Sequence, residues 1–147
     1  MSAWRAPLYP DPEADQGLHQ LGLSLLVGAG IPDAVAEGYR LNLPLRTVAR
    51  VGGDAIAPLF EVDNPAVVIE AVKLAEDRSG DVVVRLYEAH GSRARARVIR
   101  CFEAADAVET DLLERPLGAP RAIVAAEGDA TALEFRPFQL VTLRFAR

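Results

Sequence analysis

The sequence predicts an all-β protein, an antiparallel β-sandwich with one short helix over residues 32–41. Two observations lead to this prediction. Apolar residues mostly alternate with other residues, which is the period of a strand with one buried face. Turn-forming residues recur every ~8–12 positions, a spacing typical of sandwiches. The 147 residues are enough for one domain with a core of its own.

The N-terminal third carries one expected strand and the expected helix. Residues 18–27 alternate loosely and predict a strand that ends at a glycine-rich turn. Pro32 suits the first turn of a helix, and Asp33 suits the positive end of the helix dipole. Three side chains of this helix roughly share one face: Val35, Tyr39 and Leu41.

The rest of the chain predicts a meander of strands separated by turns rich in Gly, Pro, Asp and Asn. The expected strands cover residues 67–75, 82–88, 93–102, 108–113, 122–126, 131–135 and 138–145. In the second of these, Val82, Val84 and Leu86 line one face, and Arg85 and Tyr87 lie on the other.

Charge and composition narrow the partners and the compartment. The net charge of −5 has the wrong sign for general binding to a phosphate backbone, so nucleic acid is not expected as a partner. No apolar run approaches the ~20 residues of a membrane span, and no signal pattern opens the chain. We therefore expect a cytoplasmic protein with no membrane partner. The single cysteine, Cys101, excludes an internal disulfide and predicts a small core or interface residue.

An acidic segment near the N-terminus offers the first candidate site. Asp11, Glu13 and Asp15 lie close in sequence to His19, a set that could bind a hard metal ion. The spacing is not that of a calcium loop, however, and neighbouring prolines make the segment extended. A solvated acidic turn is the favoured interpretation.

An arginine stripe offers the second candidate. Arg93, Arg95 and Arg97 alternate with alanines and line one face of a strand, where guanidinium groups could bind phosphate or carboxylate. Such a stripe is more often the solvated face of an edge strand, and the acidic total charge favours that interpretation.

Glu88 offers the third candidate. It continues the apolar phase of its strand and lies between Tyr87 and His90. Such a carboxylate is equally consistent with a sugar-contacting edge and with an ion pair to a neighbouring arginine. Hydrolysis of a glycoside needs two carboxyl groups roughly 5–9 Å apart, and the sequence alone does not place such a pair.

Several segments add a family resemblance, and they occur in the family's order. They are residues 5–15, Gly17, His19 and residues 39–45, 68–77, 85–92, 111–115 and 137–143. Together they resemble the C-terminal region of family 38 α-mannosidases, with the greatest likeness to the metal-dependent cytosolic and bacterial branch. The chain departs from the family at residues 28–30, where relatives often carry His-Ala-Gly, and at Leu21, which replaces a usual Phe.

The resemblance implies that the catalytic half lies outside this chain. In the family an N-terminal barrel carries the nucleophilic Asp, the acid/base carboxylate and the metal ligands, and a barrel needs on the order of 200 residues. We therefore expect residues 1–147 to form one supersandwich-like domain, the C-terminal portion of a retaining α-mannosidase that hydrolyses terminal α-mannosides. No catalytic or metal-binding residue is assigned to this chain, and the Zn²⁺ or Co²⁺ of the full-length enzyme would lie elsewhere.

The same resemblance suggests partners and a substrate-contacting rim. The expected partners are the catalytic barrel, an α-mannoside at the rim of the cleft, and a second copy of the chain that covers exposed apolar surface. The rim candidates are Arg5, His19, Tyr87, Glu88 and His90. The alternative is a free-standing carbohydrate-binding or interaction module that has kept the sandwich and lost the barrel. A complete small enzyme is disfavoured.

Overall fold

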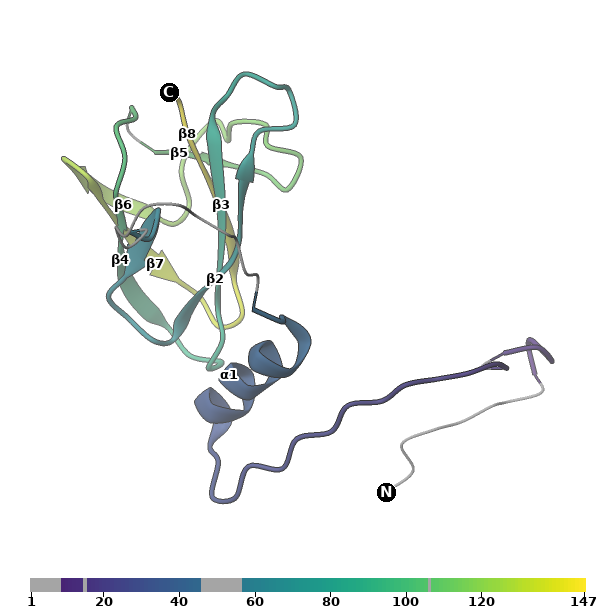
Figure 1. Cartoon of the computed structure of the whole chain (residues 1–147). Helices are drawn as coiled ribbons and strands as arrows, with labels where there is room; N and C mark the ends of the chain where they lie inside the picture. The colour runs from purple at the N-terminus through teal and green to yellow at the C-terminus, as the bar shows by residue number, and fades with distance from the viewer. Residues whose placement is uncertain (1–8, 15, 46–56, 106) are drawn as a thin grey trace, which may run out of the picture.

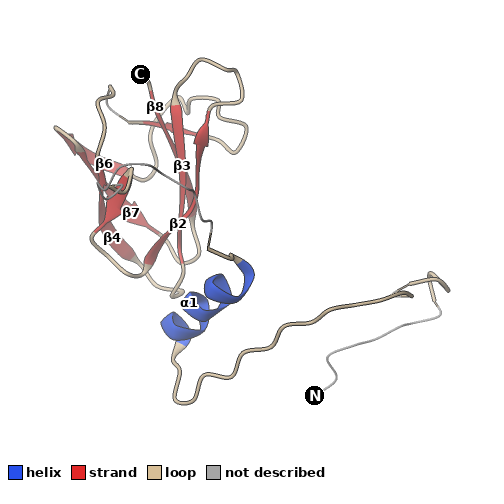
Figure 2. Ribbon diagram, viewed as in Figure 1, coloured by secondary structure: helices blue, strands red, loops and turns tan. Residues whose placement is uncertain are grey.

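Two facing β-sheets form the body of the protein (Figures 1 and 2). The computed structural model describes residues 9–14, 16–45, 57–105 and 107–147. Sheet A has the strand order β1-β4-β7-β6 and sheet B the order β2-β3-β8-β5, and every pairing is antiparallel. The predicted sandwich with one short helix is therefore confirmed. The elements are α1 (Ile31–Asn42), β1 (Phe60–Val62), β2 (Val67–Leu74), β3 (Val82–Glu88), β4 (Ala94–Arg100), β5 (Val108–Thr110), β6 (Ile123–Glu127), β7 (Ala130–Phe135) and β8 (Leu140–Phe145).

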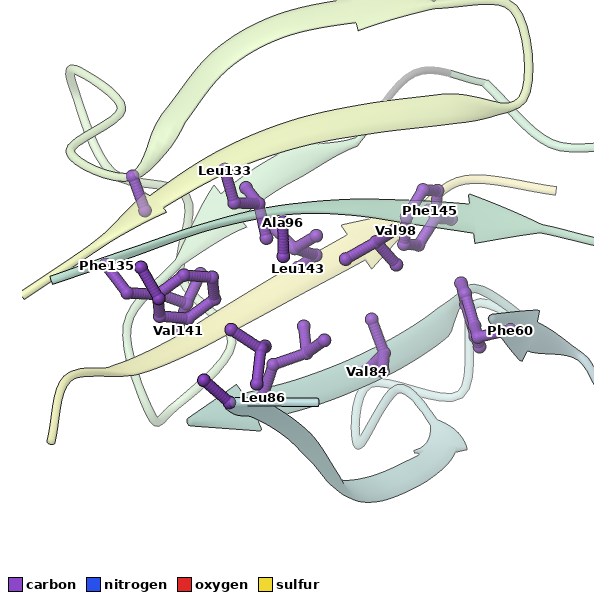
Figure 3. Packing of buried hydrophobic residues seen from close by; sticks show 14 of the residues in the cluster. Phe60, Val84, Leu86, Ala96, Val98, Leu133, Phe135, Val141, Leu143 and Phe145 are labelled. Carbon is purple, nitrogen blue, oxygen red and sulfur yellow. The ribbon is translucent and has the colours of Figure 1, made fainter. Parts of the chain in front are cut away.

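The core lies between the two sheets (Figure 3). Leu86 of β3 and Leu143 of β8 are fully buried, and Leu133 of β7 faces them from the other sheet with 1% of its surface exposed. The ring of Phe60 packs at 5.3 Å from the rings of both Phe102 and Phe145. The period-two alternation of apolar residues produces this core, because alternate side chains of each strand point to the same face.

The helix forms close to its predicted position, one residue longer at each end. Gly30 precedes its first turn, and the Gly30 main-chain N–H donates to the Asp33 carboxylate at 2.9 Å. None of the α1 side chains is fully buried, and Leu41 is 46% exposed. The helix lies at one end of the sandwich (Figure 1) and does not enter its core.

The strand predicted over residues 18–27 is wrong. These residues pair with no strand among the described residues. They belong to an extended arm, residues 9–14 and 16–30, that runs beyond α1 and not along either sheet (Figure 1). Leu23, Leu25 and Val27 are 77%, 89% and 90% exposed. Alternation gives a segment the side-chain pattern of a strand, but a strand forms only beside a pairing partner.

The prediction of an edge strand is wrong for β4 as a whole but not for the part that carries the arginine stripe. β4 lies between β1 and β7 in sheet A, but β1 pairs only with residues 98–100, so no described strand flanks residues 94–97 on that side. β1 is short, so side chains that follow it complete the contact: Asp63 accepts the Arg97 main-chain N–H at 2.7 Å, and Asn64 donates to the Arg95 carbonyl at 2.8 Å. Arg95 and Arg97 are exposed, as the solvated interpretation expects.

Two smaller expectations also need correction. Cys101 was expected on a strand and in a core or interface. It lies just beyond β4 and is exposed, so it is not a core residue, while its place in an interface stays a prediction. β1 was not expected, because its three residues are too few to show a period.

No helix among the described residues is long and apolar enough to cross a membrane.

Replacing a core leucine tests the position of the core. Leu86→Ala removes a fully buried side chain and is expected to lower the free energy of unfolding by about 2–5 kcal/mol in urea denaturation. Leu74→Ala on β2, where the leucine is 62% exposed, is the control and should change it by no more than about 1 kcal/mol. Equal losses in the two variants would contradict this core.

Candidate functional site

The carboxylate of Glu88 is buried at the end of β3, where it binds main-chain N–H groups. One oxygen, Oε1, accepts the His90 N–H at 2.8 Å. The other, Oε2, accepts the Gly91 N–H at 2.8 Å and the Phe138 N–H at 3.0 Å. The side chain has no exposed surface. Glu88 therefore ties the turn after β3 to the turn after β7, and we call this arrangement the Glu88 clamp.

The surroundings of Glu88 keep its carboxylate ionised. Burial is the largest single influence and by itself would raise the pKa, since the charged form loses water. The N–H groups of Phe138, His90, Ser92 and Gly91 outweigh burial and hold the pKa of Glu88 below its ordinary value. A charged group without solvent is tolerated here because its hydrogen bonds replace those of water.

Gly91 adopts a backbone conformation in the clamp that favours glycine. Its φ angle is +74°, in the left-handed region, and a Cβ at this position would lie 2.7 Å from the tip of the Phe138 ring. Another residue would be strained by this φ angle and would also displace the exposed Phe138 ring.

The clamp changes the interpretation of Glu88. Its inward phase agrees with the sequence analysis. Of the two alternatives left open there, the ion pair with an arginine is not found among the described residues. The sugar contact stays a prediction, and in this structure both carboxylate oxygens are occupied by the main chain. The signal that sequence reasoning lacked is the Phe138 N–H, which lies 50 residues away along the chain.

Tyr87 lies on the outer face of sheet B and contacts the helix. The Tyr39 hydroxyl of α1 donates to the Tyr87 hydroxyl at 3.1 Å. Burial, this hydrogen bond, and the charges of Tyr87 and Glu70 raise the pKa of Tyr39 to about 12, so its proton is retained at neutral pH. The two rings line an open groove of about 510 Å³ between α1 and sheet B, together with Val35 and Glu70.

The other rim candidates lie in different parts of the chain. His90 is half-buried on the turn held by the clamp, two residues after Glu88. His19 is exposed and belongs to the extended arm, not to the sandwich. Arg5 lies outside the described residues, as does Asp15 of the acidic segment. Tyr87 and Glu88 point to opposite faces of β3, and His90 is joined to Glu88 only through its main-chain N–H. A sugar contact of these residues, and of His19, stays a prediction.

Two further buried carboxylates escaped the sequence analysis. Glu109 accepts the main-chain N–H groups of Arg121 and Ala122 at 2.7 and 2.8 Å. Glu114 pairs with Lys73 at 2.7 Å, and that lysine is the main cause of its lowered pKa. Their burial depends on partners at least 12 residues away, which no local pattern reveals. Both groups support the fold, as Glu88 does.

The described residues offer no metal centre: no group of three or more His, Cys, Asp or Glu side chains gathers closely enough to hold an ion. The buried carboxylates of Glu88, Glu109 and Glu114 instead bind main-chain N–H groups or a lysine. The residues described here therefore do not fit the divalent metal that the family resemblance implies for a full-length enzyme.

Comparison with known proteins identifies the class of this fold. The family model of the glycosyl hydrolases family 38 C-terminal beta sandwich domain matches residues 66–143. These residues include every strand except β1 and the end of β8, and they include the whole Glu88 clamp. The chain belongs to this family.

Two mammalian proteins are similar to nearly the whole chain. Human alpha-mannosidase 2C1 is 36% identical over 153 residues, and its mouse counterpart is 33% identical over 150 residues. Both alignments cover 97% of this chain but only 14% of the relative. The chain therefore spans about a seventh of the length of these relatives.

Neutralising the clamp tests its contribution to stability. Glu88→Gln keeps the shape of the side chain but turns an amide NH₂ toward main-chain N–H donors. We expect the free energy of unfolding at pH 7 to fall by about 2–4 kcal/mol. Glu61→Gln, on the exposed face of β1, is the control and should change it by less than about 0.5 kcal/mol.

The effect of Glu88→Gln should also depend on pH. The folded state lowers the pKa of Glu88, so its stabilisation is fully present above the unfolded pKa of about 4.3 and is lost as the pH falls through the folded pKa. The difference between wild type and variant, measured by urea denaturation, should be largest above about pH 5 and shrink toward pH 2. A difference that grows on acidification would contradict an ionised clamp.

Proposed function

We propose that this chain acts as the C-terminal β-sandwich of a retaining α-mannosidase of the metal-dependent branch, which hydrolyses terminal α-mannosides, and that it is not catalytic alone. The observation that carries the proposal is the extent of the alignment with human alpha-mannosidase 2C1. It covers 97% of this chain but only 14% of that relative. Most of such an enzyme, including its catalytic barrel and its Zn²⁺ or Co²⁺, then lies outside these residues.

The contacts of the buried carboxylates support the proposal that the isolated chain does not catalyse hydrolysis. A retaining glycosidase needs a nucleophile and an acid/base group about 5–5.5 Å apart, both facing the sugar. Glu88 and Glu109 instead accept main-chain N–H groups, and Glu114 pairs with Lys73. Each of these carboxylates is thus engaged in holding the fold together.

The proposed docking surface consists of the arm, residues 9–14 and 16–30, and the adjoining face of α1. The arm is attached to the helix, because the Ser24 hydroxyl donates to Glu37 at 2.6 Å. Its exposed apolar side chains are Leu18, Leu21, Leu23, Leu25, Leu26 and Val27. Covering a leucine is worth about 1.5–3 kcal/mol. Packing against the catalytic barrel would remove this surface from water, and in the isolated chain a second copy would cover it.

The proposed rim of the substrate cleft is formed by Tyr87 and His90. Both side chains are partly exposed, and the clamp fixes the turn that carries His90. Tyr87 and Tyr39 also line the groove of about 510 Å³ beside α1, at the end of the sandwich nearest the proposed docking surface.

A cytoplasmic location is part of the same proposal, since Cys101 is an exposed free thiol, which reducing compartments preserve.

An assay with an aryl α-mannoside tests the catalytic part of the proposal. The purified chain is expected to show no turnover above the uncatalysed rate, with or without added Zn²⁺ or Co²⁺. Turnover that metal stimulates and that Glu88→Ala abolishes would overturn the proposal. Tight binding of mannosides without hydrolysis would instead favour the free-standing carbohydrate-binding module.

The oligomeric state tests the docking surface. Light scattering of the isolated chain should show a mass that increases with concentration, because the arm is uncovered. The double variant Leu23→Asp and Leu25→Asp should shift the chain toward the monomer by making this surface polar. Leu113→Asp changes a leucine that is 72% exposed on a turn of the sandwich and should leave the association unchanged. A monomeric wild type at all concentrations would argue against the surface.

A further inference from the structure

Four arginines gather around a hollow of about 390 Å³ at the end of sheet A. Arg93 and Arg95 come from the start of β4, Arg121 precedes β6, and Arg136 follows β7. The other lining residues are Ala94, Glu134, Phe135 and Gln139. The arginine stripe predicted from the sequence is therefore divided, because Arg97 does not line this hollow but a separate one beside β6 and β7.

The charges in this arginine hollow are not balanced. Arg95 pairs with Glu134 at 2.6 Å. Arg136 contacts only a neutral group, the Gln139 amide oxygen, at 3.3 Å. Within the described part of the chain, the guanidinium groups of Arg93, Arg121 and Arg136 have no carboxylate partner. Three uncompensated positive charges thus lie together in a protein whose net charge is −5.

The main chain that carries these three arginines is fixed by buried carboxylates. Arg93 follows the turn that the Glu88 clamp holds through His90 and Gly91, and Arg136 begins the turn held through Phe138. Arg121 donates its own main-chain N–H to Glu109 at 2.7 Å. The bases of the side chains therefore keep their relative positions before any ligand binds, which reduces the entropy lost on binding.

We propose that the arginine hollow binds the phosphoryl group of a small molecule. Guanidinium groups bind oxyanions through two parallel hydrogen bonds. Three of them can be matched by the several oxygens of a tetrahedral dianion, whereas a carboxylate has only two oxygens to share. The ligand is inorganic phosphate or a phosphate ester, and this site is independent of the proposed α-mannosidase function.

Calorimetric titration of the full chain with inorganic phosphate at low ionic strength tests the site. Removing one guanidinium by Arg93→Gln or Arg121→Gln should weaken binding about tenfold or more, as expected for one charge-assisted interaction. Arg78→Gln is the matched control, since Arg78 is exposed on the turn between β2 and β3, and it should change affinity less than twofold. Thermal unfolding of each variant confirms that the fold is retained.

The source of the phosphoryl group is resolved by a second titration with a hexose 6-phosphate. Tighter binding of the ester than of phosphate would support a sugar phosphate as ligand, and equal binding would support free phosphate. Three results would overturn the proposal: no binding, binding that Arg93→Gln and Arg78→Gln weaken equally, or acetate binding as tightly as phosphate. The second would indicate an adventitious ion only.

Discussion

A single buried carboxylate organises the end of the sandwich that carries the candidate sites. Moving an ionised carboxylate out of water is costly unless its hydrogen bonds are replaced. Glu88 meets this condition only when the turn after β3 and the turn after β7 both present their N–H groups to it. The hydrogen bonds to this one side chain therefore hold the two turns together, and Gly91 supplies the positive φ angle of the first turn.

The candidate surfaces surround this clamp. On the side of sheet B, Tyr87 joins the strand to the helix through the Tyr39 hydroxyl. On the side of sheet A, the arginine hollow uses the same two turns and a third segment held by Glu109. The buried carboxylates thus hold the turns in place. The exposed side chains on those turns are the groups that a ligand could contact.

The arm and the sandwich differ in whether their apolar side chains are buried. The sandwich buries its own apolar residues between two sheets and completes its core without the arm. The arm, by contrast, exposes a series of leucines and contacts the rest of the chain mainly at α1. The two alpha-mannosidase 2C1 relatives are about seven times longer than this chain, and the proposed role of the arm is to pack on the corresponding further parts of such a protein.

Features that depend on neighbours in the chain could be predicted from the sequence. Alternation revealed the strands other than β1 and the inward phase of Glu88, and local end signals revealed the helix. The contacts that each group makes followed from tertiary packing. It left residues 18–27 without a pairing partner, placed β4 inside its sheet, and exposed Cys101. It also gave Glu88 the N–H of Phe138 and buried Glu109 and Glu114. The reason is physical: side-chain period is local, whereas pairing and charge compensation involve residues distant in sequence.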